Sequence, residues 1–451
     1  GLKVILFIVC SYAVILVTLT CLAGIHTAST PEDCDDNPSN CKYDGAFIML
    51  LTTFHGTTWG HILPATQVQQ AIACIVAAMG YLWPLGTAVV ILALAGKGKL
   101  AKRGALAFGV LYLLLTILGN LVMSIIMIAS DGHMADKGIG SVFYFSWLTF
   151  HSRSYGALYP NSALEDVCTI MIQLDGTAAW LVPLLIVARS AALNTARHLQ
   201  NPVPGKTLLP ESLAATLLPY FLNGIAILIL SGIYTALDHD DCNQAENQQH
   251  EINTCGYGNA LFLLLTTFHG NAFGHMRPRT HGQAAVACIV ASLGFLWRHV
   301  IAILVLRVVQ QPALAKIAAT ALSLTYTLLA VICNLAFAGI IVALDGPLCR
   351  ESQQLSLEWD NTAEVTGQVD GCSFGGIFYY VWMSFHSRAY GELVANTSLE
   401  ELVSVCVVVA SASCWVVPVL AVLKRASIIG ILQEVSPNAP PTVFGVCHEG
   451  A

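Results

Sequence analysis

The sequence has little charge. Of its 451 residues only 10% are Asp, Glu, Lys or Arg, whereas 56% are hydrophobic, and the mean hydropathy is +0.68. A soluble protein of this length needs far more surface charge, so the composition predicts that the bilayer is the solvent. The chain also lacks a Walker loop, a zinc-ligand helix, a Ser/His/Asp pattern and the regular Arg or Lys spacing of a voltage sensor. These absences argue against an enzyme and a metal site, and we expect no cofactor and no nucleic-acid partner.

Long apolar runs, by contrast, are frequent. Eight runs are long enough to span a bilayer, at roughly 3–25, 67–95, 104–130, 164–190, 212–237, 283–308, 314–344 and 399–423. The connections at 96–103, 189–211 and 307–316 and the tail after 423 are basic, and the opposite loops hold most of the 27 acidic residues. The positive-inside rule then predicts cytosolic termini and acidic outer loops. We expect an integral protein of the plasma membrane or of another secretory-pathway membrane.

The outer loops contain cysteines in pairs. Six of the 15 cysteines lie there: Cys34 and Cys41, Cys242 and Cys255, and Cys349 and Cys372. Paired cysteines in an oxidising compartment predict local disulfides, although bridges between loops remain an alternative. Asn396 begins an Asn-Thr-Ser glycosylation sequon on the same side.

One short phrase occurs four times, each time between two apolar runs. It reads LTTFHGTTWGHILP at Leu51–Pro64, WLTFHSRSYGALYP at Trp147–Pro160, LTTFHGNAFGHMRP at Leu265–Pro278 and WMSFHSRAYGELVA at Trp382–Ala395. The first and third copies match closely, as do the second and fourth, so the chain is a tandem repeat. We expect a first half at 1–203, a second half at 204–428 and a cytosolic tail at 429–451. Each half contains two quarters of helix, re-entrant loop and helix.

These quarters resemble the potassium-channel superfamily, and most closely the two-pore-domain potassium channels, whose pore loop reads roughly T-T-V-G-Y-G-D-x-x-P. Alignment on the final Pro places the selectivity filter on Gly56, Thr57, Thr58, Trp59 and Gly60; Ser152, Arg153, Ser154, Tyr155 and Gly156; Gly270, Asn271, Ala272, Phe273 and Gly274; and Ser387, Arg388, Ala389, Tyr390 and Gly391. Hinge glycines of the inner helices fall on Gly80, Gly176 and Gly294, with Ser411 in the fourth quarter. The resemblance implies an all-α membrane protein with eight transmembrane helices and four re-entrant pore helices, in a pseudo-tetrameric P-loop channel fold.

The filter departs from that family. Its first glycine is replaced in all four quarters, by Thr58, Ser154, Ala272 and Ala389. A filter lined by backbone carbonyls demands conformations that glycine tolerates, so we expect strain at these positions. Poor discrimination between potassium and sodium is the functional expectation.

Polar residues of the phrase admit two interpretations each. The histidines His55, His151, His269 and His386 could form a ring that titrates or binds a cation, or could be buried behind the filter and hold the loop. Arg153 and Arg388 could face the pore and repel cations, or could pair with an acid such as Glu165 or Glu392. Asp175, inside a membrane helix, is expected to face a wet cavity.

The expected function is passive conduction of monovalent cations, with potassium as the candidate ion. The alternatives are an anion- or proton-selective pore and a non-conducting structural membrane protein that keeps a channel-derived fold. The expected partners are the lipid bilayer and the permeant ion; the sequence identifies no protein partner.

Overall fold

The computed structural model describes residues 2–29, 43–57, 64, 66–94, 98–130, 132–155, 158–198, 208–237, 256–271, 278, 280–308, 312–343, 373–388 and 398–435. Within these ranges the chain is helical and contains no strand. The six outer-loop cysteines, Asn396, Glu392 and the chain after 435 lie outside them. So do ten filter residues: Thr58, Trp59, Gly60, Gly156, Ala272, Phe273, Gly274, Ala389, Tyr390 and Gly391.

Each quarter contains a long outer helix, a short helix and a long inner helix. Quarter one has α1 (Leu2–Ala28), α2 (Tyr43–His55) and α3 (Gln67–Leu94). Quarter two has α4 (Gly98–Leu113), η2 (Leu114–Gly119) and α5 (Asn120–Ile128) as its outer helix, then α6 (Ile139–Phe150) and α7 (Ala163–His198). Quarter three has α8 (Leu208–Ala236), α9 (Tyr257–His269) and α10 (His281–Val308). Quarter four has α11 (Pro312–Tyr326) and η4 (Thr327–Cys333) in its outer helix, then α13 (Phe374–Phe385) and α14 (Ser398–Val435).

Seven helices in the described part are long and apolar enough to cross a membrane. They match seven of the eight predicted runs, and the chain is therefore an all-α protein of membrane type. The remaining run corresponds to α8, a helix of 29 residues in which Phe221–Ala236 forms a shorter apolar stretch. Lipid-facing side chains agree with this assignment, because large apolar residues such as Leu106 and Phe221 are each 66% exposed.

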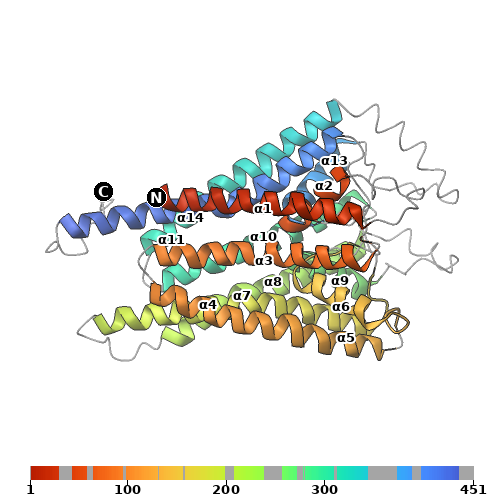
Figure 1. The fold of residues 1–451 in the computed structure, drawn as a ribbon, viewed down its shortest axis with the longest axis horizontal. Helices are drawn as coiled ribbons and strands as arrows, with labels where there is room; N and C mark the ends of the chain where they lie inside the picture. The colour runs from red at the N-terminus through yellow and green to blue at the C-terminus, as the bar shows by residue number, and fades with distance from the viewer. Residues whose placement is uncertain are drawn as a thin grey trace.

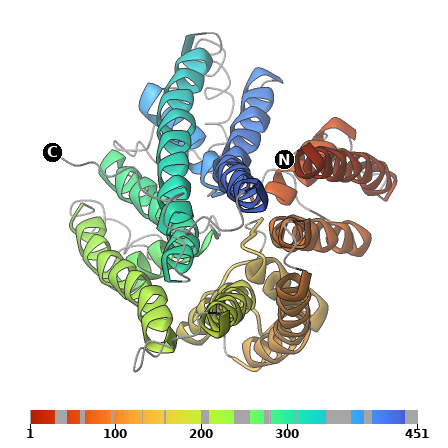
Figure 2. The same cartoon turned by 90° about the vertical axis from the view of Figure 1, so that its left-hand side faces the viewer.

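The four quarters follow one another around the molecule. Figure 2 shows the helices in chain order around the bundle, from red at α1 to blue at α14. Each inner helix packs against the short helix of the next quarter: α3 against α6, α7 against α9, α10 against α13, and α14 against α2. The last of these contacts returns to quarter one, so the packing is cyclic. The short helices all lie toward the same end of the bundle (Figure 1).

Two outer helices change their winding at equivalent positions. The π-helical segments η2 and η4 each follow directly on a segment that ends near a tyrosine, Tyr112 and Tyr326. A π-helical turn is rare and often marks a functional position. Here it recurs in quarters two and four, which are also the quarters with arginine as the seventh residue of the repeated phrase, at Arg153 and Arg388.

Candidate functional site

The four short helices end in the same turn. In quarter one the N–H of Gly56 donates to Thr53 O (3.2 Å), and the N–H of Thr57 donates to Thr52 O (2.9 Å). The same pair of bonds recurs at the ends of α6, α9 and α13. This is a Schellman C-cap, which requires a left-handed residue after the helix.

The left-handed residues are Gly56, Ser152, Gly270 and Ser387, with φ of 102°, 58°, 102° and 60°. Glycine tolerates this conformation and serine rarely adopts it, so the strain lies at Ser152 and Ser387. The sequence predicts strain two residues later, at Thr58, Ser154, Ala272 and Ala389. Of the four residues that replace the first filter glycine, the structure describes Ser154, and its φ is not positive. For Ser154 that expectation is wrong, because the C-cap places the left-handed residue earlier.

Arg153 of quarter two reaches into quarter one. Its Nε donates to Thr53 O (2.7 Å) and its Nη2 donates to Phe54 O (3.0 Å), both at the C-terminal end of α2. Its Nη1 also donates to His151 O of its own quarter. The side chain is buried, with 7% of its surface exposed. A single guanidinium therefore binds the carbonyl ends of two neighbouring short helices.

Arg388 of quarter four makes the equivalent contacts to quarter three. Its Nε donates to Thr267 O (2.8 Å), its Nη2 to Phe268 O (2.9 Å) and its Nη1 to His386 O. We call these two contacts, between quarters one and two and between quarters three and four, the arginine interfaces. The partners found in both are helix carbonyls, which neither interpretation from the sequence named, and Glu392 lies outside the described residues. The Glu165 carboxylate instead accepts from the N–H groups of Met134 and Asn161, each at 2.7 Å.

Neutral side chains form the other two interfaces. Between quarters two and three, Ser152 Oγ donates to His269 O (2.9 Å) and Asn271 Nδ2 donates to Thr149 O (3.1 Å). Between quarters four and one, Ser387 Oγ donates to His55 O (3.1 Å) and Thr57 Oγ1 donates to Ser384 O (3.3 Å). We call these the serine interfaces.

A single rule covers all four interfaces. The residue after the left-handed turn is Thr57, Arg153, Asn271 or Arg388, and in each case it donates to the same carbonyl of the preceding quarter. Those carbonyls belong to Ser384, Thr53, Thr149 and Thr267. The four hydrogen bonds thus form a closed cycle. Helix C-terminal ends have negative partial charge, so the two arginines also neutralise the ends of all four short helices.

The predicted hinge glycines lie where the inner helices meet these ends. A Cβ added to Gly80, Gly176 or Gly294 would lie 1.8, 2.3 or 2.0 Å from the carbonyl oxygen of Phe54, Phe150 or Phe268. No side chain fits at such distances. At Gly80 and Gly294 the added atom would also lie 2.9 and 2.7 Å from Nη2 of the arginine. Close helix packing therefore accounts for glycine at these positions.

Three of the four histidines of the repeated phrase are hydrogen-bonded to tyrosines of the outer helices. Nε2 of His55, His151 and His386 is hydrogen-bonded to Tyr12, Tyr112 and Tyr326 of the outer helices, at 2.8, 2.8 and 2.9 Å. Nδ1 of His151 and of His386 lies 2.7 Å from a tryptophan carbonyl one turn earlier. A carbonyl accepts only, so Nδ1 carries the proton there and neutral Nε2 accepts from tyrosine. Nδ1 of the fourth histidine, His269, lies 3.4 Å from Thr177 Oγ1. Among the described residues no group of His, Cys, Asp or Glu could hold a metal.

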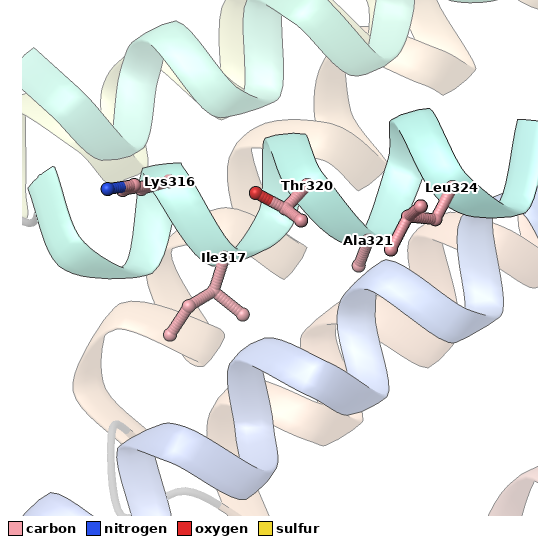
Figure 3. A pocket seen from close by; sticks show the side chains of 5 residues that line it. All are labelled: Lys316, Ile317, Thr320, Ala321 and Leu324. Atoms are coloured by element: carbon pink, nitrogen blue, oxygen red, sulfur yellow. The ribbon is translucent and has the colours of Figure 1, made fainter.

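Two further polar positions lie away from the cycle. The Asp175 carboxylate is half-buried and lies toward Gly119 of η2, since a Cβ added to that glycine would be 3.3 Å from Oδ2. Its carboxyl group therefore faces the outer helix of its own quarter. A pocket of about 370 Å³ lies on α11, where Figure 3 shows Lys316, Ile317, Thr320, Ala321 and Leu324 along the helix. It contains no residue of the cycle.

Sequence reasoning missed Arg298 and the three tyrosines. Arg298 lies on α10 inside the span His281–Leu304, and its Nη2 is 3.4 Å from His269 O. The signal was present, because a charged residue inside an apolar span is unusual. The tyrosines gave no such signal, since tyrosine is common in apolar helices.

Comparisons of the chain with models of known protein families, with curated proteins and with solved structures found no match. Inferences about function therefore depend on the geometry and on the resemblance of the repeated phrase.

Proposed function

We propose that the chain is a channel of pore-loop type that forms its pore alone and conducts monovalent ions passively. The observation that carries the proposal is the closed cycle of hydrogen bonds from Thr57, Arg153, Asn271 and Arg388. A cycle built from the same position of four repeats implies one axis within a single chain. The segments that follow each left-handed turn would then run beside that axis.

Monovalent cations are the ions that we assign to this pore, with potassium as the candidate. The acidic outer loops support the assignment, because negative charge at a pore mouth raises the local cation concentration. The replacement of four filter glycines predicts weak discrimination between potassium and sodium.

Anion conduction is the second candidate. The observation that favours it is the pair of buried guanidinium groups at the helix ends, which offset the negative partial charge that would otherwise stabilise a cation there.

Current recording across planar bilayers that contain the purified chain tests both candidates. Under a potassium chloride gradient, a cation pore gives a reversal potential with the sign of the potassium equilibrium potential. An anion pore gives the opposite sign, that of the chloride equilibrium potential. A potassium–sodium exchange then measures discrimination, which should be poor. A variant with glycine at Thr58, Ser154, Ala272 and Ala389 should discriminate better. Leu106→Ala, at a lipid-facing position, is the control and should leave the current unchanged. No current from correctly folded chain would overturn the proposal.

A further inference from the structure

Arg298 breaks the four-fold pattern of the inner helices. It lies four residues after Gly294, and the positions four residues after Gly80, Gly176 and Ser411 are Pro84, Trp180 and Trp415. Quarter three thus has a charge where the other quarters have an apolar or aromatic residue. A charged side chain inside a span is costly, and such residues usually serve a function.

The guanidinium of Arg298 lies at the carbonyl end of α9. Residues four apart share one face of a helix, so Arg298 projects from the same face of α10 as Gly294. That face meets Phe268 O and the Arg388 guanidinium, as the added Cβ at Gly294 indicates. Nη2 of Arg298 lies 3.4 Å from His269 O, which also accepts from Ser152 at 2.9 Å. Two guanidinium groups therefore lie near the end of the same short helix.

Arg298 has fewer partners than Arg153 or Arg388. Its hydrogen bond to His269 O is longer than the usual distance of about 2.9–3.0 Å. Its Nε is enclosed and has no partner among the described residues, and no carboxylate in that part of the chain pairs with it. The residue as a whole is half-buried, so part of the side chain remains accessible. An enclosed guanidinium without a counter-charge is unfavourable, and so is its proximity to a second one.

We infer that the Arg298 guanidinium, through the donors that His269 O leaves unused, binds a small monovalent inorganic anion of the size and charge of chloride. Such an anion supplies a counter-charge that the described residues do not provide, and it offsets the repulsion between Arg298 and the Arg153 guanidinium. A monovalent anion fits this place better than phosphate, because the cost of removing an ion from water rises steeply with its charge. Binding at this site does not require ion conduction.

Chloride titration of the full-length chain in lipid nanodiscs tests this inference. Sodium chloride replaces sodium gluconate at constant ionic strength, and the thermal unfolding temperature is measured. The temperature should rise with chloride in the unaltered chain. Arg298→Gln should weaken the apparent chloride affinity at least about tenfold, because a hydrogen bond to a charged group is lost. Arg103→Gln, at an exposed arginine of α4, is the control and should keep the full response.

A second measurement does not depend on a variant that folds. Crystals of the unaltered chain grown in sodium bromide should give an anomalous bromide peak within hydrogen-bond distance of the Arg298 guanidinium. Absence of that peak would overturn the inference, as would an unfolding temperature indifferent to chloride or an equal response in Arg298→Gln. Neither measurement requires the chain to conduct ions, so a failed anion site and a failed channel would be recognised separately.

Discussion

The arginine interfaces and the serine interfaces occupy equivalent places in the cycle but differ in chemistry. At an arginine interface one buried guanidinium binds three carbonyl groups from two short helices. At a serine interface two short neutral side chains each bind one carbonyl, and the serine Cβ lies 3.0 Å from where a Cβ on the facing glycine would be. Hydrogen bonds from a charged donor are roughly twice as strong as neutral ones. The two kinds of interface should therefore differ in strength.

The difference follows the tandem repeat of the sequence. Arg153 joins quarters one and two, and Arg388 joins quarters three and four, so each predicted half contains one arginine interface. The serine interfaces join the halves to each other. Within the cycle, the hydrogen bonds inside each half thus come from charged donors, whereas those between the halves come from neutral donors; apolar packing joins the halves as well, because one core cluster contains both Phe150 and Phe268.

Loss of an arginine should have the largest effect. Arg153→Ala or Arg388→Ala leaves several buried carbonyl groups without their donor, and each unsatisfied group costs about 1–3 kcal/mol. We expect the free energy of unfolding to fall by about 3 kcal/mol or more, measured by thermal unfolding in detergent. Arg153→Lys keeps the charge but loses the planar set of guanidinium donors. Its free energy of unfolding should lie between those of Arg153→Ala and the unaltered chain.

The matched controls are Ser152→Ala and Ser387→Ala at the serine interfaces. Each removes one neutral hydrogen bond and should cost about 1 kcal/mol. Equal losses at the two kinds of interface would contradict the difference in strength.

A side chain at the close-approach glycines should have the next largest effect. Gly80→Ser places an atom 1.8 Å from Phe54 O and 2.9 Å from the Arg153 guanidinium, so the inner helix must move. We expect the free energy of unfolding to fall by about 3 kcal/mol, which is at the upper end of the range for overpacked cores. Gly176→Ser should cost less, because its added atom lies 2.3 Å from Phe150 O and because quarter four already has Ser411 at that position.

Gly86→Ala is the control on the same helix as Gly80. Nothing lies within 4 Å of its added Cβ, so this variant should unfold at the same or a higher temperature. A loss at Gly86 as large as at Gly80 would show that helix flexibility, rather than contact, explains the glycines.

Removal of a tyrosine hydroxyl should have the smallest effect. Tyr112→Phe and Tyr326→Phe take a hydrogen bond from His151 and His386, whose carbonyls bind the arginines, and each should cost about 1 kcal/mol. Tyr12→Phe should cost less, because its partner His55 is half-buried and can exchange tyrosine for water. Thermal unfolding measures all three, and a larger loss at Tyr12 would reverse the expected order.

Periodicity and repetition predicted much of this architecture. The apolar runs predicted seven spans that the structure contains, and the repeated phrase marks the ends of four short helices. These features are local, because a helix, its apolar length and its C-cap depend on residues close together in the chain.

The hydrogen-bond partners were beyond the reach of local patterns. Arg153 binds carbonyls 99 and 100 residues earlier, and Arg388 binds carbonyls 120 and 121 residues earlier. Backbone carbonyls leave no mark in a sequence, so reasoning from residue types looked for acidic partners instead. The same limit applies to the predicted hinge glycines, because the sequence does not show that a carbonyl of the short helix lies against each of them.

The sequence by itself determined that the chain is helical, suited to a membrane and built from four repeats. Tertiary structure decided how the repeats meet: which interfaces are charged, which are neutral, and where Arg298 lies, with no counter-charge among the described residues. The physical reason is that composition and periodicity report how each segment is solvated. A buried charge is instead stabilised by whichever dipoles the packed fold brings next to it.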